Sequence, residues 1–154
     1  MIRALYRTIA TAAITAGLLV TTASAATPTT SFTAVFHERV CANTPAGPRF
    51  CGTGVIDRYG PVTTKTLLSL PTAGPEPGCQ TFKGTRTATL TKDRRSTLRF
   101  AVQGPGCGTQ TWGTFRIVSG TGIFAHASGT GVIWGTFSGG TLLTHYYGVI
   151  RLSR

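Results

Sequence analysis

Apolar and polar residues alternate along most of the chain after residue 30, with the period of two that is typical of β-strands. The alternation is clearest in 96–103, where Leu98, Phe100 and Val102 are separated by more polar neighbours. No segment shows helical periodicity over more than one turn. Eight segments combine the pattern with Thr, Val, Ile, Phe, Tyr and Trp: 32–40, 54–59, 63–70, 80–91, 96–103, 110–118, 131–138 and 141–152.

Clusters of Gly, Pro and Asp separate these segments. They predict hairpin turns at 60–61, 92–93, 104–106 and 139–140, and a longer loop at 71–78. Eight strands with short turns can close into a barrel, which leaves no exposed sheet edge. We therefore expect an all-β fold, a single eight-stranded antiparallel β-barrel over 31–154. A β-sandwich is the alternative.

The alternation also assigns the two faces of each strand. In the first strand one face carries Phe32, Ala34, Phe36, Glu38 and Val40. In the fourth strand the corresponding set is Phe82, Gly84, Arg86, Ala88 and Leu90. We expect both sets to line the interior, which would place two charged residues there, Glu38 and Arg86. The last strand is apolar on both faces, so the pattern does not assign Tyr146 and Tyr147.

The first 25 residues have the layout of a secretory signal peptide. Arg3 and Arg7 precede an uncharged apolar run at 9–20, and Ala23-Ser24-Ala25 is a small-x-small cleavage site. A transmembrane anchor is the alternative, but the run is too short and too rich in threonine to span a bilayer comfortably. We predict cleavage near Ala25, a secreted protein, a loose lead at 26–30 and no transmembrane segment. Arginine outnumbers lysine and Ala, Gly and Thr are abundant, which is typical of a bacterial genome rich in G and C.

The four cysteines of an exported chain predict two disulfides. Three pairings are possible, and we favour Cys41–Cys51 and Cys79–Cys107. The first would join the ends of a Pro/Gly loop at 42–50, and the second would join two hairpin partners. A structural zinc site is the alternative, although the chain contains no Cys-x-x-Cys pair.

A glycine-rich stretch at 119–131 carries Gly120, Gly122, Gly129 and Gly131 around a short apolar piece. Such glycines permit sharp turns and close backbone approach. We expect a tight crossing at one end of the barrel, with Phe124 plugging that end.

Two stretches resemble the allene oxide cyclase and dirigent family. Residues 120–129 are similar to its Gly-Thr-Gly-x-Phe-x-x-Ala-x-Gly element, and Val-Phe-His-Glu at 35–38 resembles the aromatic-His-acid segment of dirigent proteins. The resemblance implies an eight-stranded antiparallel barrel around an apolar cavity, in which family enzymes cyclise reactive lipids and dirigent proteins steer radical coupling. It carries the family's acid over to Glu38, where this chain has Glu instead of Asp.

Glu38 is the candidate catalytic residue, because a carboxyl in an apolar cavity has a raised pKa that suits a general acid or base. Arg86 on a neighbouring inward face would act in the opposite direction. The alternatives are a buried Glu–Arg pair and a Glu38 at the barrel mouth. We expect a ligand site made of Phe36, Glu38, Arg86 and Phe124, and we expect His37 to point outward.

Charge gives a second functional hint. Lysine and arginine number 15 and Asp and Glu number 4, for a net charge of +11. Lys92, Arg94 and Arg95 crowd one turn and would attract an anionic surface or polymer. The alternative is a solvated face that aids solubility. No motif with interleaved aromatics supports specific nucleic-acid reading.

Cofactor and metal motifs are not evident. Gly120-x-Gly122-x-x-Ala125 fits the loose dinucleotide fingerprint, but a strand follows where that fingerprint needs a long helix. His37, His126 and His145 lack metal-ligand spacing. We expect neither a cofactor nor a metal. Trp112 and Trp134 could stack on a sugar, although strand tryptophans more often belong to the core.

Three functions therefore remain open. The first is a secreted barrel that binds a small apolar ligand without turning it over. The second is a cyclase or isomerase that uses Glu38. The third is a structural or surface-binding barrel that engages an anionic envelope polymer. A cavity above about 300 Å³, the low end for ligand pockets, would favour the first two, and a filled interior would favour the third.

Overall fold

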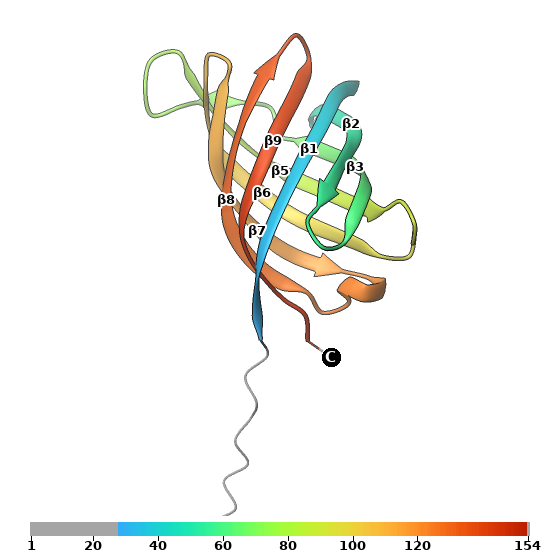
Figure 1. Ribbon diagram of the computed structural model, residues 1–154. Coiled ribbons are helices and arrows are strands. Elements are labelled where there is room, and N and C mark those ends of the chain that lie inside the picture. Colours follow the sequence, from blue (N-terminus) through green and yellow to red (C-terminus); the bar gives the residue numbers. More distant parts are fainter. Residues whose placement is uncertain (1–27, 154) are drawn as a thin grey trace, which may run out of the picture.

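The computed structural model describes residues 28–153, and its strands wrap into a ring (Figure 1) around one hydrophobic core. The first strands are β1 (Thr29–Thr44), β2 (Gly47–Ile56), β3 (Gly60–Leu68) and the two-residue β4 (Thr72–Ala73). The others are β5 (Cys79–Leu90), β6 (Thr97–Cys107), β7 (Gln110–Gly120), β8 (Ser128–Ser138) and β9 (Thr141–Arg151). One 3-10 turn, Gly122–Phe124, lies between β7 and β8.

The strands form one closed antiparallel barrel. Their order is β3-β2-β1-β9-β8-β7-β6-β5-β4, and β3 also pairs with β5. That pairing, from Val62↔Leu90 to Leu68↔Gly84, closes the ring. β4 is an extra strand outside the ring and pairs only with β5. The predicted eight-stranded barrel is therefore confirmed, and the closure excludes a sandwich of two sheets.

The ring has two different ends. One end carries the turns at 45–46, 108–109 and 139–140 together with the segment 69–78, and we call it the mouth. The other carries the turns at 57–59, 91–96 and 121–127, and we call it the closed end. β1 starts and β9 finishes at the closed end, where Thr29 pairs with Arg151 (Figure 1).

Some predicted boundaries were wrong, chiefly at Gly and Pro positions. β2 begins at Gly47, inside the predicted loop 42–50, and the predicted turn at 104–106 lies within β6. Pro105 pairs with Thr81 of β5, but the β6–β7 pairs skip Gly104 and Pro105, between Gln103↔Thr114 and Gly106↔Thr111. A proline, which has no N–H to donate, is tolerated at such an interruption. β1 likewise begins at Thr29, within the predicted lead 26–30.

The inward faces follow the predicted parity with one correction. Phe32, Ala34, Phe36 and Glu38 are buried, whereas Val40 is 38% exposed. Val40 lies past the last β1–β9 pair, Arg39↔Thr141, and directly before a register shift in the β1–β2 pair between Val40 and Ala42. The alternation of β1 therefore holds only up to Glu38.

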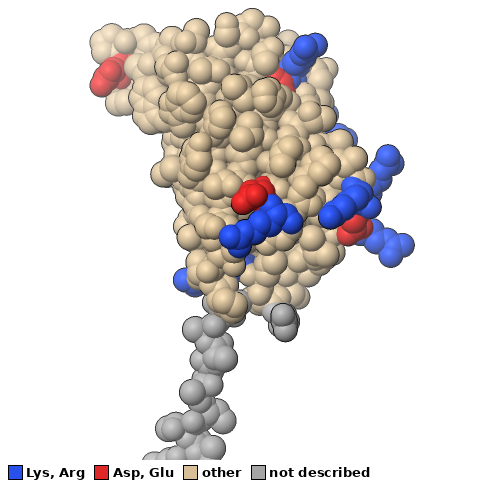
Figure 2. Space-filling view, viewed as in Figure 1, with Lys and Arg blue, Asp and Glu red and all other residues tan. Residues whose placement is uncertain are grey.

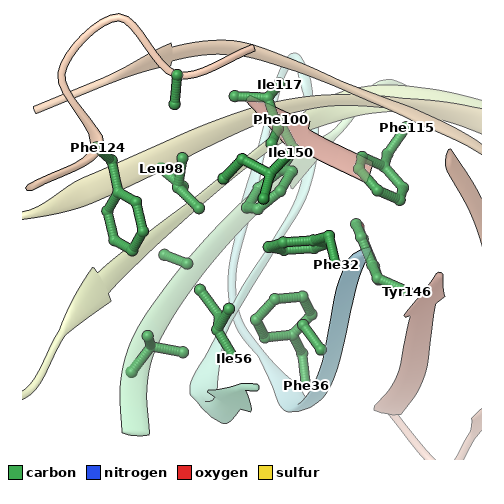
Figure 3. Close-up of a cluster of buried hydrophobic side chains, with 14 of the residues drawn as sticks. Phe32, Phe36, Ile56, Leu98, Phe100, Phe115, Ile117, Phe124, Tyr146 and Ile150 are labelled. Carbon is green, nitrogen blue, oxygen red and sulfur yellow. The ribbon is translucent and has the colours of Figure 1, made fainter. Parts of the chain in front are cut away.

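Aromatic rings fill the middle of the barrel (Figure 3). Phe100 packs against Phe32, Phe115 and Tyr146 with ring centres 5.5–5.9 Å apart. Phe124 lies at one side of this cluster, away from Phe115 and Tyr146. It is 0% exposed, and its ring meets the edge of Tyr59 at 4.9 Å. Phe124 thus plugs the closed end.

Both predicted disulfides are confirmed. Cys41–Cys51 joins β1 to β2 at the bulge, and Cys79–Cys107 joins two residues that are direct register partners in β5 and β6. They tie neighbouring strands near the mouth.

The predicted signal peptide and cleavage site lie outside the described residues. Within 28–153, no helix has the length and apolarity needed to cross a bilayer.

Candidate ligand-binding site

A cavity of about 210 Å³ opens at the mouth. Its walls are mostly apolar and include Phe50, Leu68, Phe82, Ile133, Phe137 and Leu142. An apolar cavity of about 150 Å³ holds one benzene molecule, whereas pockets for drug-sized ligands begin at about 300 Å³. The cavity is therefore smaller than the size of about 300 Å³ that would favour a ligand site on volume alone, but it is large enough for a ligand with one ring or a short chain.

The polar part of the cavity wall is built around Arg86, which β5 places on its inward face. Its Nε donates to Thr66 Oγ1 at 2.8 Å and its Nη1 donates to Thr144 Oγ1 at 2.9 Å. Its Nη2 donates to Glu38 Oε2 at 2.6 Å. Thr66, Thr144 and Arg86 all line the cavity, although the arginine itself is only 2% exposed. The guanidinium is held in a fixed orientation by three strands.

Glu38 lies behind Arg86 and is not a cavity-lining residue. It is 1% exposed, and both carboxylate oxygens have partners, since Thr66 donates to Oε1 at 2.8 Å and Arg86 donates to Oε2. A buried charge is costly unless it is paired and hydrogen-bonded. Each charge of the pair is therefore balanced by the other. Of the alternatives considered for Glu38, a buried ion pair with Arg86 is the one that the structure contains.

Two aromatic rings complete the surroundings of Arg86. Its Cζ atom lies 4.6 Å from the centre of the Phe36 ring and 5.0 Å from that of Tyr146, both within cation–π range. Burial raises the pKa of Tyr146 to about 12, with Arg86 partly offsetting that effect and Glu38 adding to it. Tyr146 thus remains a protonated hydroxyl beside the cavity at neutral pH.

Thr111 adds a polar atom to the cavity wall. Its Oγ1 is buried and, among residues 28–153, it has no hydrogen-bond partner. A buried hydroxyl without a partner costs about 1–3 kcal/mol. A ligand with a polar group at the mouth could satisfy it.

The predicted ligand residues are only partly brought together. Arg86 lines the cavity, Glu38 lies behind it, and Phe36 packs against both the guanidinium and the core. Phe124 is at the opposite, closed end and takes no part in the cavity. The cavity wall also contains four residues that the sequence did not single out: Thr66, Thr144, Tyr146 and Leu142. Of these, Thr66 follows from its alternation with Thr64 and Val62 in β3.

The predicted anionic-surface residues do come together. Lys92, Arg94 and Arg95 are all exposed on the turn 91–96 at the closed end. Asp93 orders this turn, because its carboxylate accepts hydrogen bonds from the Ser96 hydroxyl and from the Arg95 N–H. The same two bonds lower the pKa of Asp93, so one negative charge stays within the basic turn.

The remaining singled-out residues lie on the outer surface. His37 is exposed, as parity predicts. The core assignment favoured for Trp112 and Trp134 was wrong, since they are 43% and 50% exposed. Within the described chain, no group of three or more His, Cys, Asp or Glu side chains is placed to hold a metal ion.

Comparison of the chain with known protein families and with curated proteins finds no match.

Proposed function

We propose that this protein is a secreted barrel that binds a small ligand at the mouth without turning it over. The observation that carries the proposal is an apolar cavity whose polar wall is a buried, fixed arginine. The ligand has an apolar body of about one ring and one oxygen that accepts hydrogen bonds. The resemblance of 35–38 and 120–129 to allene oxide cyclase and dirigent proteins supports a cavity role.

Arg86 supplies the polar recognition in this proposal. A guanidinium has five N–H donors, and the bonds to Glu38, Thr66 and Thr144 use three of them. In this proposal the remaining donors and the Thr111 hydroxyl bond to a carbonyl, hydroxyl or carboxylate group of the ligand. Because Glu38 already balances the arginine's charge, a neutral acceptor is favoured over a strongly anionic one.

Catalysis by Glu38 is the less supported alternative. A general base must reach the proton that it removes, at about 2.6–3.2 Å. Glu38 is separated from the cavity by Arg86, and both of its oxygens are engaged.

Binding can be tested with phenol, cyclohexanone and benzoate as probes, titrated against uniformly ¹⁵N-labelled protein. Shifts confined to backbone amides around the mouth are expected. Leu142→Trp would fill the cavity and abolish them, whereas Leu143→Trp, one residue along β9 on the other face, would leave them intact. No probe-dependent shifts at the mouth, or equal shifts in both variants, would refute the proposal.

Secretion itself predicts that protein recovered from the culture medium begins at or near Ala26, and a mature chain that still contained Arg3 would contradict it.

A second function, engagement of an anionic envelope polymer, is favoured by a separate observation. Three basic side chains project from one ordered turn at the closed end, and on the face in Figure 2 most Lys and Arg atoms lie toward the lower half. Such a patch attracts anions over a distance set by ionic strength. This function would use the closed end and the first would use the mouth, so the two are compatible.

A further inference from the structure

Four ring-bearing side chains form a ledge on the outer face of the barrel. They are Trp112 on β7, Trp134 on β8, and His145 and Tyr147 on β9, and together we call them the aromatic ledge. Trp134 is the register partner of both Trp112 and His145, so these three lie in one row across three neighbouring strands. Trp112, Trp134 and Tyr147 are 43%, 50% and 50% exposed.

Three of the four rings of the ledge lie close together. The Trp134 and His145 ring centres are 5.6 Å apart with their planes tilted by 41°, and the planes of His145 and Tyr147 differ by 6° at 6.4 Å. Neighbouring strands are about 4.8 Å apart, so the row from Trp112 to His145 crosses roughly 10 Å of the sheet. Successive flat units of a chain molecule could therefore stack on successive rings.

The immediate surroundings of the ledge are uncharged. In the adjacent register rows lie Thr114 and Val132 on one side, and Gln110, Thr136 and Leu143 on the other. The surface over the labelled parts of β8 and β9 carries no charged atoms in Figure 2. Trp and Tyr also each offer one N–H or O–H donor at the edge of the ring. This combination fits a neutral partner with flat apolar faces and a rim of hydroxyls.

We propose that the aromatic ledge binds the sugar rings of a neutral polysaccharide. A pyranose ring has one face of C–H bonds, which stacks on an aromatic ring, and equatorial hydroxyls, which bond to donors and acceptors beside it. The ledge by itself is smaller than a stable interface between two copies of this chain. Three aromatic side chains that are about half exposed present on the order of 300 Å², whereas a stable interface needs about 800 Å² per partner. This site is separate from the mouth cavity and from the basic turn.

The test is a depletion assay with insoluble cellulose, chitin and β-1,3-glucan at about 1 M NaCl, where the Debye length is only about 3 Å. High salt removes attraction that depends on Lys92, Arg94 and Arg95. The full-length mature protein should be retained on at least one of the three solids. Trp112→Ala/Trp134→Ala should weaken that retention by about tenfold or more. The matched control Val118→Ala/Ile123→Ala also removes exposed apolar side chains, but away from the ledge, and should bind like the wild type.

Three results would overturn the proposal. The first is no retention on any of the solids, and the second is equal retention of the tryptophan double variant and the wild type. The third is a double substitution that leaves polysaccharide binding unchanged but abolishes another interaction. That interaction would be dimerisation, measured by sedimentation velocity, or binding to phosphatidylcholine vesicles. That result would assign the ledge to a second copy or to a lipid surface. None of these results would bear on ligand binding at the mouth.

Discussion

Arg86 Nη2 lies 2.6 Å from Glu38 Oε2, and both side chains are almost wholly buried inside the barrel. The two residues are 48 positions apart in the sequence and come from strands that do not pair with each other. The pair therefore connects opposite parts of the ring, whereas each backbone ladder joins only neighbouring strands.

Breaking this pair should destabilise the barrel strongly. Arg86→Met or Glu38→Gln leaves the other charge buried and only partly satisfied, and we expect either change to lower the free energy of unfolding by about 3–5 kcal/mol. The double variant Arg86→Met/Glu38→Leu removes both charges and should recover part of that loss. Urea unfolding followed by circular dichroism measures all three. Single changes that cost no more than Glu76→Gln, on an exposed loop, would show that the pair is unimportant for stability.

Stability should also fall at alkaline pH because of Tyr146. Burial raises its pKa from 10.0 to about 12, so the folded state keeps a proton that the unfolded state loses between these values. The stabilisation is complete below pH 10 and decreases as the pH rises toward 12. A difference of about two pKa units corresponds to roughly 2–3 kcal/mol.

Tyr146→Phe, which cannot ionise, should therefore show a smaller loss of stability than the wild type between pH 9 and about pH 12. Tyr147→Phe is the matched control, because Tyr147 is adjacent on β9 but half exposed. Parallel pH profiles for wild type and Tyr146→Phe would contradict the assignment.

The two disulfides should contribute unequally. In the chain-entropy model a cross-link stabilises by restricting the unfolded chain, and more so when the loop is longer. The sequence separations are 10 for Cys41–Cys51 and 28 for Cys79–Cys107. The expected contributions are about 2.7 and about 3.6 kcal/mol. Thermal unfolding of the two double Cys→Ser variants measures the order, and a larger loss from the Cys41/Cys51 variant would contradict it.

The basic turn should bind anions in a salt-dependent manner with little sequence preference. Replacing Lys92, Arg94 and Arg95 with Ser should weaken retention on anionic vesicles and on duplex DNA alike, since nothing at the turn is built to read base edges. On duplex DNA, the logarithm of the binding constant falls linearly with the logarithm of the salt concentration. The slope of that line should become less negative by roughly 0.9 for each phosphate that the variant no longer neutralises.

The control for that experiment removes the same charge elsewhere. Lys65, Arg99 and Arg116 are exposed on three different strands, and their triple Ser variant lowers the net charge equally. Retention should fall less in this control than in the turn variant. Equal retention of the two variants would mean that net charge alone, and not the turn, governs binding.

The sequence predicted the barrel well because alternation reports burial directly. Leu98, Phe100 and Val102 are all buried, and the turn at Gly139-Gly140 has the positive φ that favours glycine. The mouth cavity could not be predicted in the same way. Its wall combines residues from distant strands and from segments assigned to loops, such as Phe50 and Pro71.

The two tryptophans show a different kind of error. Phe115 and Ile117 point inward on β7, so strand parity places Trp112 on the outer face. On β8 Ile133 points inward, so its neighbour Trp134 lies on the outer face as well. The general preference of tryptophan for cores predicts the opposite of what strand parity predicts at these two positions. The local pattern was the better guide because the sheet has only two faces.

The pairing of β1 with β9 makes the strand order a circle with one covalent link missing, at the closed end beside Thr29 and Arg151. A circular permutant with those ends joined and new termini at Gly139-Gly140 would keep every ladder of the barrel. A chain that stopped before Thr141 would instead leave β1 and β8 as free edges, which are prone to pair with other molecules. Because the last strand must be made before the ring can close, we expect the domain to fold only after its synthesis is complete, with no stable N-terminal fragment along the way.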